Sequence, residues 1–215
     1  MKRILLAILI LLIVAPVFAG TGNNSIFAFG KLNRSVDRFS YVNFRSNGQE
    51  IRERGSIFLP DTIVGNSPLD AEEVFKWNFR GNIYSPTVGS RTNTTMYLEF
   101  TLHGLVNAEG NVLNYYYMFA PEETYYDMEA PDVVETMKVS AKGGADVLGN
   151  VVCGTTVDAT TDVVARFAYR VSYEGQEPES VWNRPGRFLM YIPSENAKTS
   201  SGEYTGEVFV TISVE

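Results

Sequence analysis

The chain has 215 residues, a formal net charge of −7 at pH 7 and a single cysteine. An acidic chain lacks the excess of lysine and arginine that nucleic acids and anionic membranes attract, so neither is expected as a partner. Cys153 cannot form an intrachain disulfide, and its apolar, strand-like surroundings indicate a buried, unreactive thiol. The length suits one large domain that is stabilised by its core.

The first residues carry the pattern of a secretory signal peptide. Lys2 and Arg3 precede an almost unbroken apolar run from Ile4 to Val14, and Ala19 completes a segment suited to signal peptidase. The apolar run is shorter than the ~20 residues of a spanning helix, which disfavours an uncleaved anchor. We therefore expect cleavage after Ala19, with residues 1–19 as the leader and residues 20–215 as a single exported domain. Losing two cations and no acid changes the charge from −7 to −9.

The first half of the predicted domain reads as short strands separated by turns. Ser25–Leu32 is extended with apolar residues on both faces, and Phe39–Phe44 alternates apolar and polar residues. Asn47-Gly48 is a hairpin signal, and 57–59 is a short strand. In Val74–Arg80, three aromatic residues share one face, which predicts a core position for them. A break follows at Gly81-Asn82.

The middle of the chain contains the best candidate for a central strand and one long loop. Thr94–Leu102 alternates regularly, and 112–119 reads as its hairpin partner. Residues 120–132 contain five acids and Tyr125-Tyr126. These acids match no calcium-loop spacing, so a solvated loop is favoured over a calcium site, and no metal or other cofactor is predicted.

Strand patterns then resume and continue to the last residue. Segments 133–141, 146–157 and 165–173 read as strands, 174–184 as an acidic loop that holds Trp182, 187–193 as the penultimate strand and 194–201 as a polar turn. The last segment, Gly202–Glu215, alternates apolar and polar residues, with Gly206 suited to a bulge or a close backbone approach. Such a strand must be paired, either within the domain or by another protein.

Strands every eight to twelve residues, with turns between them, are typical of an all-β antiparallel sandwich, either immunoglobulin-like or jelly-roll-like. We expect nine to eleven strands and no amphipathic helix. The sequence leaves strand order open.

No residue pattern indicates catalysis. His103 is the only histidine, and its place at a strand end suits a surface or capping residue. Paired carboxylates for glycoside hydrolysis are an open alternative, with Glu99 in mid-strand as one candidate. A second alternative is a carbohydrate platform in the loops, formed by Tyr125, Tyr126 and Trp182.

The terminal strands resemble those of pilus subunits assembled by donor-strand exchange, the chaperone–usher pilins and the related spore-coat-U-like secreted proteins. Gly202 stands fourteen places from the end, as in that family, and the terminal strands hold the alternating residues. Two features differ: Val214 replaces the usual penultimate aromatic residue, and a cysteine pair is missing. The residues that carry the likeness are Ile26, Ala28, Gly30 and Leu32 in the first strand and Gly202, Val208, Val210, Ile212 and Val214 in the last.

The resemblance implies that a neighbouring subunit's strand fills a groove through main-chain hydrogen bonds, and that a chaperone holds the subunit beforehand. The first hypothesis is therefore an exported, non-enzymatic structural or adhesive subunit of a cell-surface assembly, whose partners are copies of itself or homologous subunits. The alternatives are a monomeric module that binds glycan or another surface ligand, and a jelly-roll glycoside hydrolase. Secretion, the periplasm and the cell surface are the expected locations.

Overall fold

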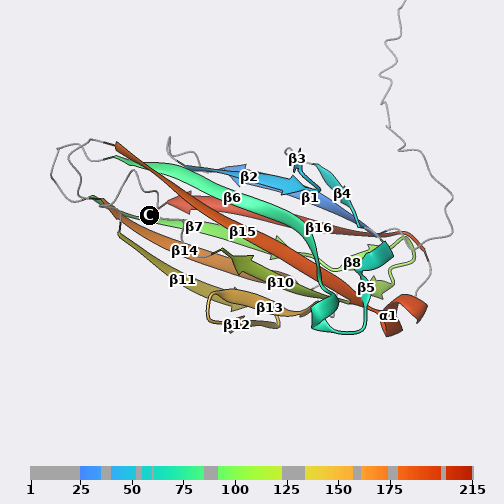
Figure 1. Cartoon of the computed structure of the whole chain (residues 1–215). Helices are drawn as coiled ribbons and strands as arrows, with labels where there is room; N and C mark the ends of the chain where they lie inside the picture. Colours follow the sequence, from blue (N-terminus) through green and yellow to red (C-terminus); the bar gives the residue numbers. More distant parts are fainter. Residues whose placement is uncertain are drawn as a thin grey trace, which may run out of the picture.

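The structure of the chain is a computed structural model. It describes residues 25–34, 40–51, 55–59, 61–84, 92–122, 134–156, 161–173, 179–199 and 202–214, so the predicted leader lies outside the described residues. Two β-sheets, here called sheet A and sheet B, face each other and enclose a common core (Figure 1). The predicted all-β sandwich is confirmed.

Sheet A contains the two terminal strands at neighbouring positions. Its pairings are antiparallel except for the pair formed by those two strands. The order is β11 (Val134–Lys142), β14 (Val163–Tyr173), β7 (Thr92–Leu102), β16 (Tyr204–Val214), β1 (Ser25–Arg34) and β4 (Ser56–Phe58), with β8 (Leu105–Asn107) paired to β16 and β9 (Val112–Leu113) paired to β8.

Sheet B is built around the two longest strands of the molecule. Its order is β12 (Ala145–Leu148), β13 (Val151–Thr156), β10 (Tyr115–Pro121), β15 (Glu179–Pro193), β6 (Glu72–Tyr84), β2 (Ser40–Ser46) and β3 (Gln49–Ile51), with β5 (Val64–Gly65) parallel to the end of β15. The described residues also form the 3-10 helices η1 (Asp61–Ile63) and η2 (Pro68–Asp70) and the helix α1 (Ser194–Thr199).

Aromatic side chains from both sheets meet in the core. The alternation in β6 directs Phe75, Trp77 and Phe79 inward, where each is at most 1% exposed, which confirms the predicted core face. Trp77 reaches across to Phe100 of sheet A with ring centroids 4.9 Å apart, and Phe75 stacks on Phe188 at 4.8 Å. Such pairs each add about 0.5–1.5 kcal/mol beyond the burial of their area.

The strand count was underestimated because short pairing segments carry no periodic signal. Sixteen strand segments occur among the described residues; ten have six or more residues, and six have two to four. Residues 194–199 form α1 where a polar turn was expected. None of the helices in the described ranges is long and apolar enough to cross a membrane.

Two predicted interruptions are in fact strand. β6 continues through Gly81 to Tyr84, and β15 begins at Glu179, so Trp182 belongs to a strand and not to a loop. The two strands pair from Glu179 opposite Tyr84 to Met190 opposite Glu72. Gly186 lies opposite Trp77, and a Cβ there would stand 2.0 Å from Trp77 Cζ2. This glycine therefore makes room for an indole ring and does not end the strand.

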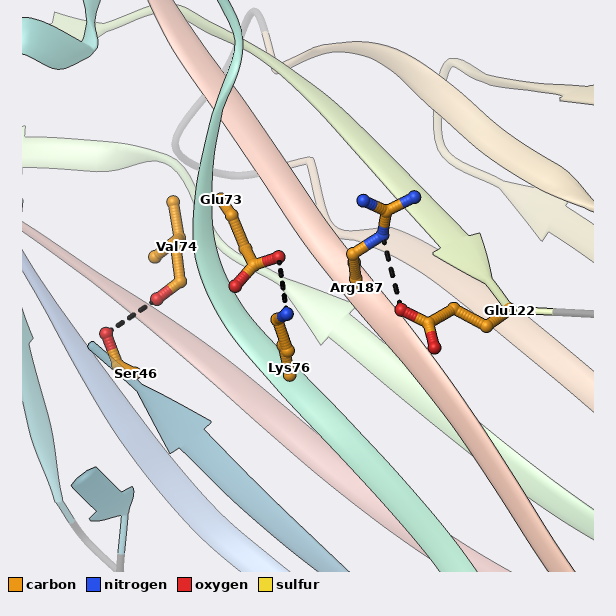
Figure 2. A network of polar contacts seen from close by, with 6 residues as sticks. All are labelled: Ser46, Glu73, Val74, Lys76, Glu122 and Arg187. Atoms are coloured by element: carbon orange, nitrogen blue, oxygen red, sulfur yellow. Dashed lines mark hydrogen bonds and ion pairs between the residues drawn. The ribbon is translucent and has the colours of Figure 1, made fainter. Parts of the chain in front are cut away.

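Sheet B carries polar contacts on and beside its solvent-facing side (Figure 2). Lys76 Nζ lies 3.4 Å from Glu73 Oε2, and Arg187 Nε lies 3.5 Å from Glu122 Oε1. Ser46 Oγ donates a hydrogen bond of 2.7 Å to the Val74 carbonyl. Exposed ion pairs of this kind contribute about 0–1 kcal/mol, so stability rests on the core and on the strand pairing.

Candidate interaction site: the terminal strands

The structure places the first described strand and the last strand side by side and parallel in sheet A (Figure 1). Ser25 lies opposite Tyr204, and the pairing runs without interruption to Phe29 opposite Val208. After an irregularity it resumes at Leu32 opposite Val210 and continues to Arg34 opposite Ile212. The two segments with alternating patterns at the chain ends therefore form one backbone ladder.

The last strand is bonded on both of its edges. On the side away from β1, it pairs with β7 from Val208 opposite Leu102 to Val214 opposite Met96, and β8 pairs with its first residues. Tyr204, Val208, Val210 and Ile212 face the core and are at most 1% exposed, whereas Glu203, Thr205 and Glu207 are exposed. The predicted alternation of this strand is confirmed.

β1 has a much shorter partner on its other edge. Its antiparallel pairing with β4 involves only three residues of each strand, from Ile26 opposite Phe58 to Ala28 opposite Ser56. β4 carries Ile57 in the core, 5% exposed, and Phe58 on the outside, 69% exposed. β1 is therefore the element that links this short strand to the rest of sheet A.

Two glycines shape the beginning of β16. Gly202 has a φ of +122°, a backbone conformation that favours glycine. At Gly206, a Cβ would lie 3.0 Å from Leu105 Cδ2 and 3.3 Å from the Gly104 carbonyl oxygen. The predicted close backbone approach at Gly206 is confirmed, and it comes from the chain between β7 and β8.

In the β1–β16 pairing, some β1 residues lie opposite buried residues of β16 and others lie opposite exposed ones. Phe27 and Phe29 lie opposite Gly206 and Val208, which are buried, whereas Ile26 and Ala28 lie opposite Thr205 and Glu207, which are exposed. The irregularity spans Gly30 and changes this parity, so that Leu32 lies opposite the buried Val210. Simple alternation from Ile26 to Leu32 could not reveal that change.

His103 follows the end of β7, close to β16. Its Nδ1 lies 2.8 Å from Asp162 Oδ1, its ring meets Phe209 edge-on at 5.0 Å, and its backbone N–H donates to the Glu207 carbonyl at 3.0 Å. The Tyr115 hydroxyl donates to the His103 carbonyl at 2.9 Å, and burial raises the pKa of Tyr115 above its usual range. These contacts tie the β7–β8 connection to both sheets.

The other candidate residues are dispersed. Glu99 lies on the outer side of β7, 4.0 Å from Arg166 Nε, and Cys153 is a buried free thiol as predicted. Tyr125, Tyr126 and all but the first three residues of the acidic segment 120–132 lie outside the described residues, and so do the loop platform and the solvated loop that were expected there. Within the described ranges, no three His, Cys, Asp or Glu side chains gather as metal ligands would.

Comparisons of the chain with protein-family models, with curated proteins and with solved structures gave no match. The class of protein is therefore defined by its architecture, an all-β sandwich whose first described strand and last strand are paired in parallel.

Proposed function

We propose that this protein is an exported, non-enzymatic subunit of a cell-surface assembly, structural or adhesive, and that subunits join by exchanging β1. In the assembled form, β1 of one copy occupies the position beside β16 of the next copy. Its partners are then copies of this chain or homologous subunits, with a chaperone covering β16 before assembly. The leader pattern at residues 1–19 supports export.

The observation that carries the proposal is the position of β1 between β16 and β4. Removing β1 would leave the β16 backbone without a partner on one edge from Tyr204 to Ile212, and would detach β4 from the sheet. An unpaired edge beside buried core residues is a template for another chain's strand. Main-chain hydrogen bonds supply affinity in such strand addition, and alternate side chains set the register.

The experiment is the mass distribution of the mature protein, residues 20–215, measured by light scattering over a range of concentrations beside a version that lacks residues 20–32. We expect polymers or exchanged dimers from the first and none from the second. Circular dichroism of both proteins shows whether the shorter one keeps its β-structure. A well-folded monomer in both cases would contradict the proposal and favour the monomeric glycan-binding alternative.

The pairing register of β1 and β16 suggests two matched double variants for the same experiment, which differ in the kind of β16 residue that lies opposite the substitutions. Replacing Phe27 and Phe29 by Asp introduces charges at positions opposite the core-facing residues Gly206 and Val208 of β16, so we expect assembly to be lost because an unpaired charge beside an apolar core is costly. Replacing Ile26 and Ala28 by Asp places the charges opposite exposed residues, and assembly should persist. Equal loss in both variants would show that the register does not govern pairing.

A further inference from the structure

The solvent-facing side of sheet A contains a polar hollow that is separate from the terminal strands. Its volume is about 460 Å³, within the range of small-molecule sites. It spans three neighbouring strands, β11, β14 and β7, and is lined by Lys138, Ala168, Arg170, Tyr97, Thr95 and Asn93.

The hollow arises from one small residue in the pairing register. Ala168 lies between Lys138 on one side and Tyr97 on the other, and Arg170 follows two positions along β14. A methyl group flanked by three long side chains leaves a depression between them. β14 pairs with β11 and with β7 through nine and eleven consecutive residues without a register shift, so the backbone beneath the hollow is regular.

The Lys138 ammonium and the Arg170 guanidinium, which line the hollow, make no ion pair or side-chain hydrogen bond with the part of the chain that the structure describes, and both residues are exposed. On sheet B, by contrast, Lys76 and Arg187 each lie close to a glutamate (Figure 2). In a chain with a net charge of −7, an ammonium and a guanidinium that line one hollow, with no carboxylate paired to them among the described residues, form a local positive site.

The aromatic wall of the hollow is held in place by a third cation. Arg166 lies with its guanidinium carbon 3.9 Å from the centroid of the Tyr97 ring, and its Nε lies 4.0 Å from Glu99 Oε2. Arg166 and Glu99 are opposite one another in the register, one row beyond Tyr97. The ring is thus supported from its own sheet and takes part in lining the hollow.

From this combination we infer that the hollow binds a sugar that carries a carboxylate. Arg170 and Lys138 match a carboxylate by charge and by their N–H donors, since a guanidinium can hold both carboxylate oxygens. Tyr97 offers the ring face that Arg166 does not cover to the C–H side of a pyranose ring, and Thr95 offers a hydrogen bond to a ring hydroxyl. This site is independent of strand exchange, because it contains no residue of β1 or β16.

The test is isothermal titration of the mature protein with two acidic probes and their neutral counterparts, at low ionic strength. The probes are trigalacturonate against its methyl ester, and sialyllactose against lactose. We expect at least one acidic probe to bind ten or more times as tightly as its neutral counterpart. The acidic probe that binds identifies whether the source is a uronic acid or a sialic acid; binding of neither, or equal binding of the neutral forms, overturns the inference.

Three variants locate the binding. Arg170→Ala should weaken it about tenfold or more, because it removes the charge-assisted hydrogen bonds to the carboxylate. Ala168→Leu places a bulky side chain in the hollow between Lys138 and Tyr97 without changing the charge, and should weaken binding at least tenfold. Lys142→Ala removes the same charge from an exposed position four residues further along β11 and should leave the affinity within about twofold. Equal loss in Lys142→Ala and Arg170→Ala, or unchanged binding in Ala168→Leu, contradicts the site.

Discussion

Two buried tyrosines in the core differ in whether their hydroxyl groups are satisfied. Tyr115 donates to the His103 carbonyl, whereas the Tyr169 hydroxyl, in the opposite sheet, has no hydrogen-bond partner among the described residues. Burial raises the pKa of both hydroxyls, which keeps them neutral. An unsatisfied buried hydroxyl costs free energy, while a satisfied one contributes about 1 kcal/mol.

Replacing each tyrosine by phenylalanine should therefore have different effects on the free energy of unfolding. Tyr115→Phe should lower it by about 1 kcal/mol, and Tyr169→Phe should leave it unchanged or raise it by up to about 1 kcal/mol. Urea unfolding followed by circular dichroism measures both. A loss of more than 1 kcal/mol in Tyr169→Phe would mean that its hydroxyl is paired in the folded protein.

The same raised pKa values predict a loss of stability in alkali. Below pH ~10, the ordinary tyrosine pKa, both the folded and unfolded states hold these protons. Above that pH the unfolded state releases them first, so the free energy of unfolding falls by up to about 1.4 kcal/mol per pH unit for each tyrosine. Urea unfolding from pH 8 to 11.5 should show this fall, with a shallower slope in Tyr169→Phe. An identical slope in the variant would argue against the burial of Tyr169.

Gly186 provides a test of the contact between β15 and Trp77. Gly186→Ala would place a methyl group 2.0 Å from Trp77 Cζ2, so we expect a loss of about 2–3 kcal/mol in the free energy of unfolding. Gly110→Ala is the control: its φ of +83° is unfavourable for alanine, but nothing lies within 4 Å, so its loss should be about 1 kcal/mol. Similar losses in the two variants would show that the indole can move aside.

At the scale of elements, long regular strands could be predicted from the sequence and interrupted ones could not. β7, β14 and β16 bury one face each, so their alternation was visible. The first part of β15 was predicted as an acidic loop, 174–184, and the strand was expected to begin only at Arg187, although twelve residues of β15 pair with β6 across Pro185-Gly186. A glycine that accommodates an aromatic ring on the neighbouring strand cannot be distinguished from a turn glycine before that neighbour is known.

The two strands that form the candidate interaction site could be predicted from the sequence, but the way in which they pair could not. The two terminal strands were recognised by their alternation, but a period of two does not reveal that they run parallel or that a shift follows Phe29. β4 has three residues and carries too little pattern to be identified as the second partner of β1. The hollow on sheet A was missed because its residues come from three strands whose pairing order the sequence does not contain.

The arrangement of β1 predicts that a free copy of this strand can replace it. A synthetic peptide of residues 25–34, added to the protein that lacks residues 20–32, should bind one to one and slow the amide hydrogen exchange of residues 204–212. A peptide with Phe27 and Phe29 replaced by Asp serves as the control and should not bind. Binding of both peptides, or of neither, would contradict the strand-specific groove.

At the scale of the whole molecule, the two proposed surfaces lie on different parts of sheet A. The exchange site involves β16, β1 and β4, whereas the positive hollow lies over β11, β14 and β7 at the other end of the strand order. A subunit could then polymerise through one end of the sheet while the other stays open to ligand. Repetition of a weak sugar site along a polymer would raise its overall affinity through multivalency.

The most direct test of strand exchange is a disulfide placed across the β1–β16 ladder. Ala28 and Glu207 are partners in the parallel register, so the double variant Ala28→Cys/Glu207→Cys, with Cys153→Ser to remove the native thiol, should form a disulfide upon assembly. Non-reducing electrophoresis then shows whether the disulfide joins two copies of the chain or lies within one copy. The account predicts a ladder of covalent oligomers that collapses to monomer on reduction. A single monomeric band with the disulfide formed within each chain would contradict it.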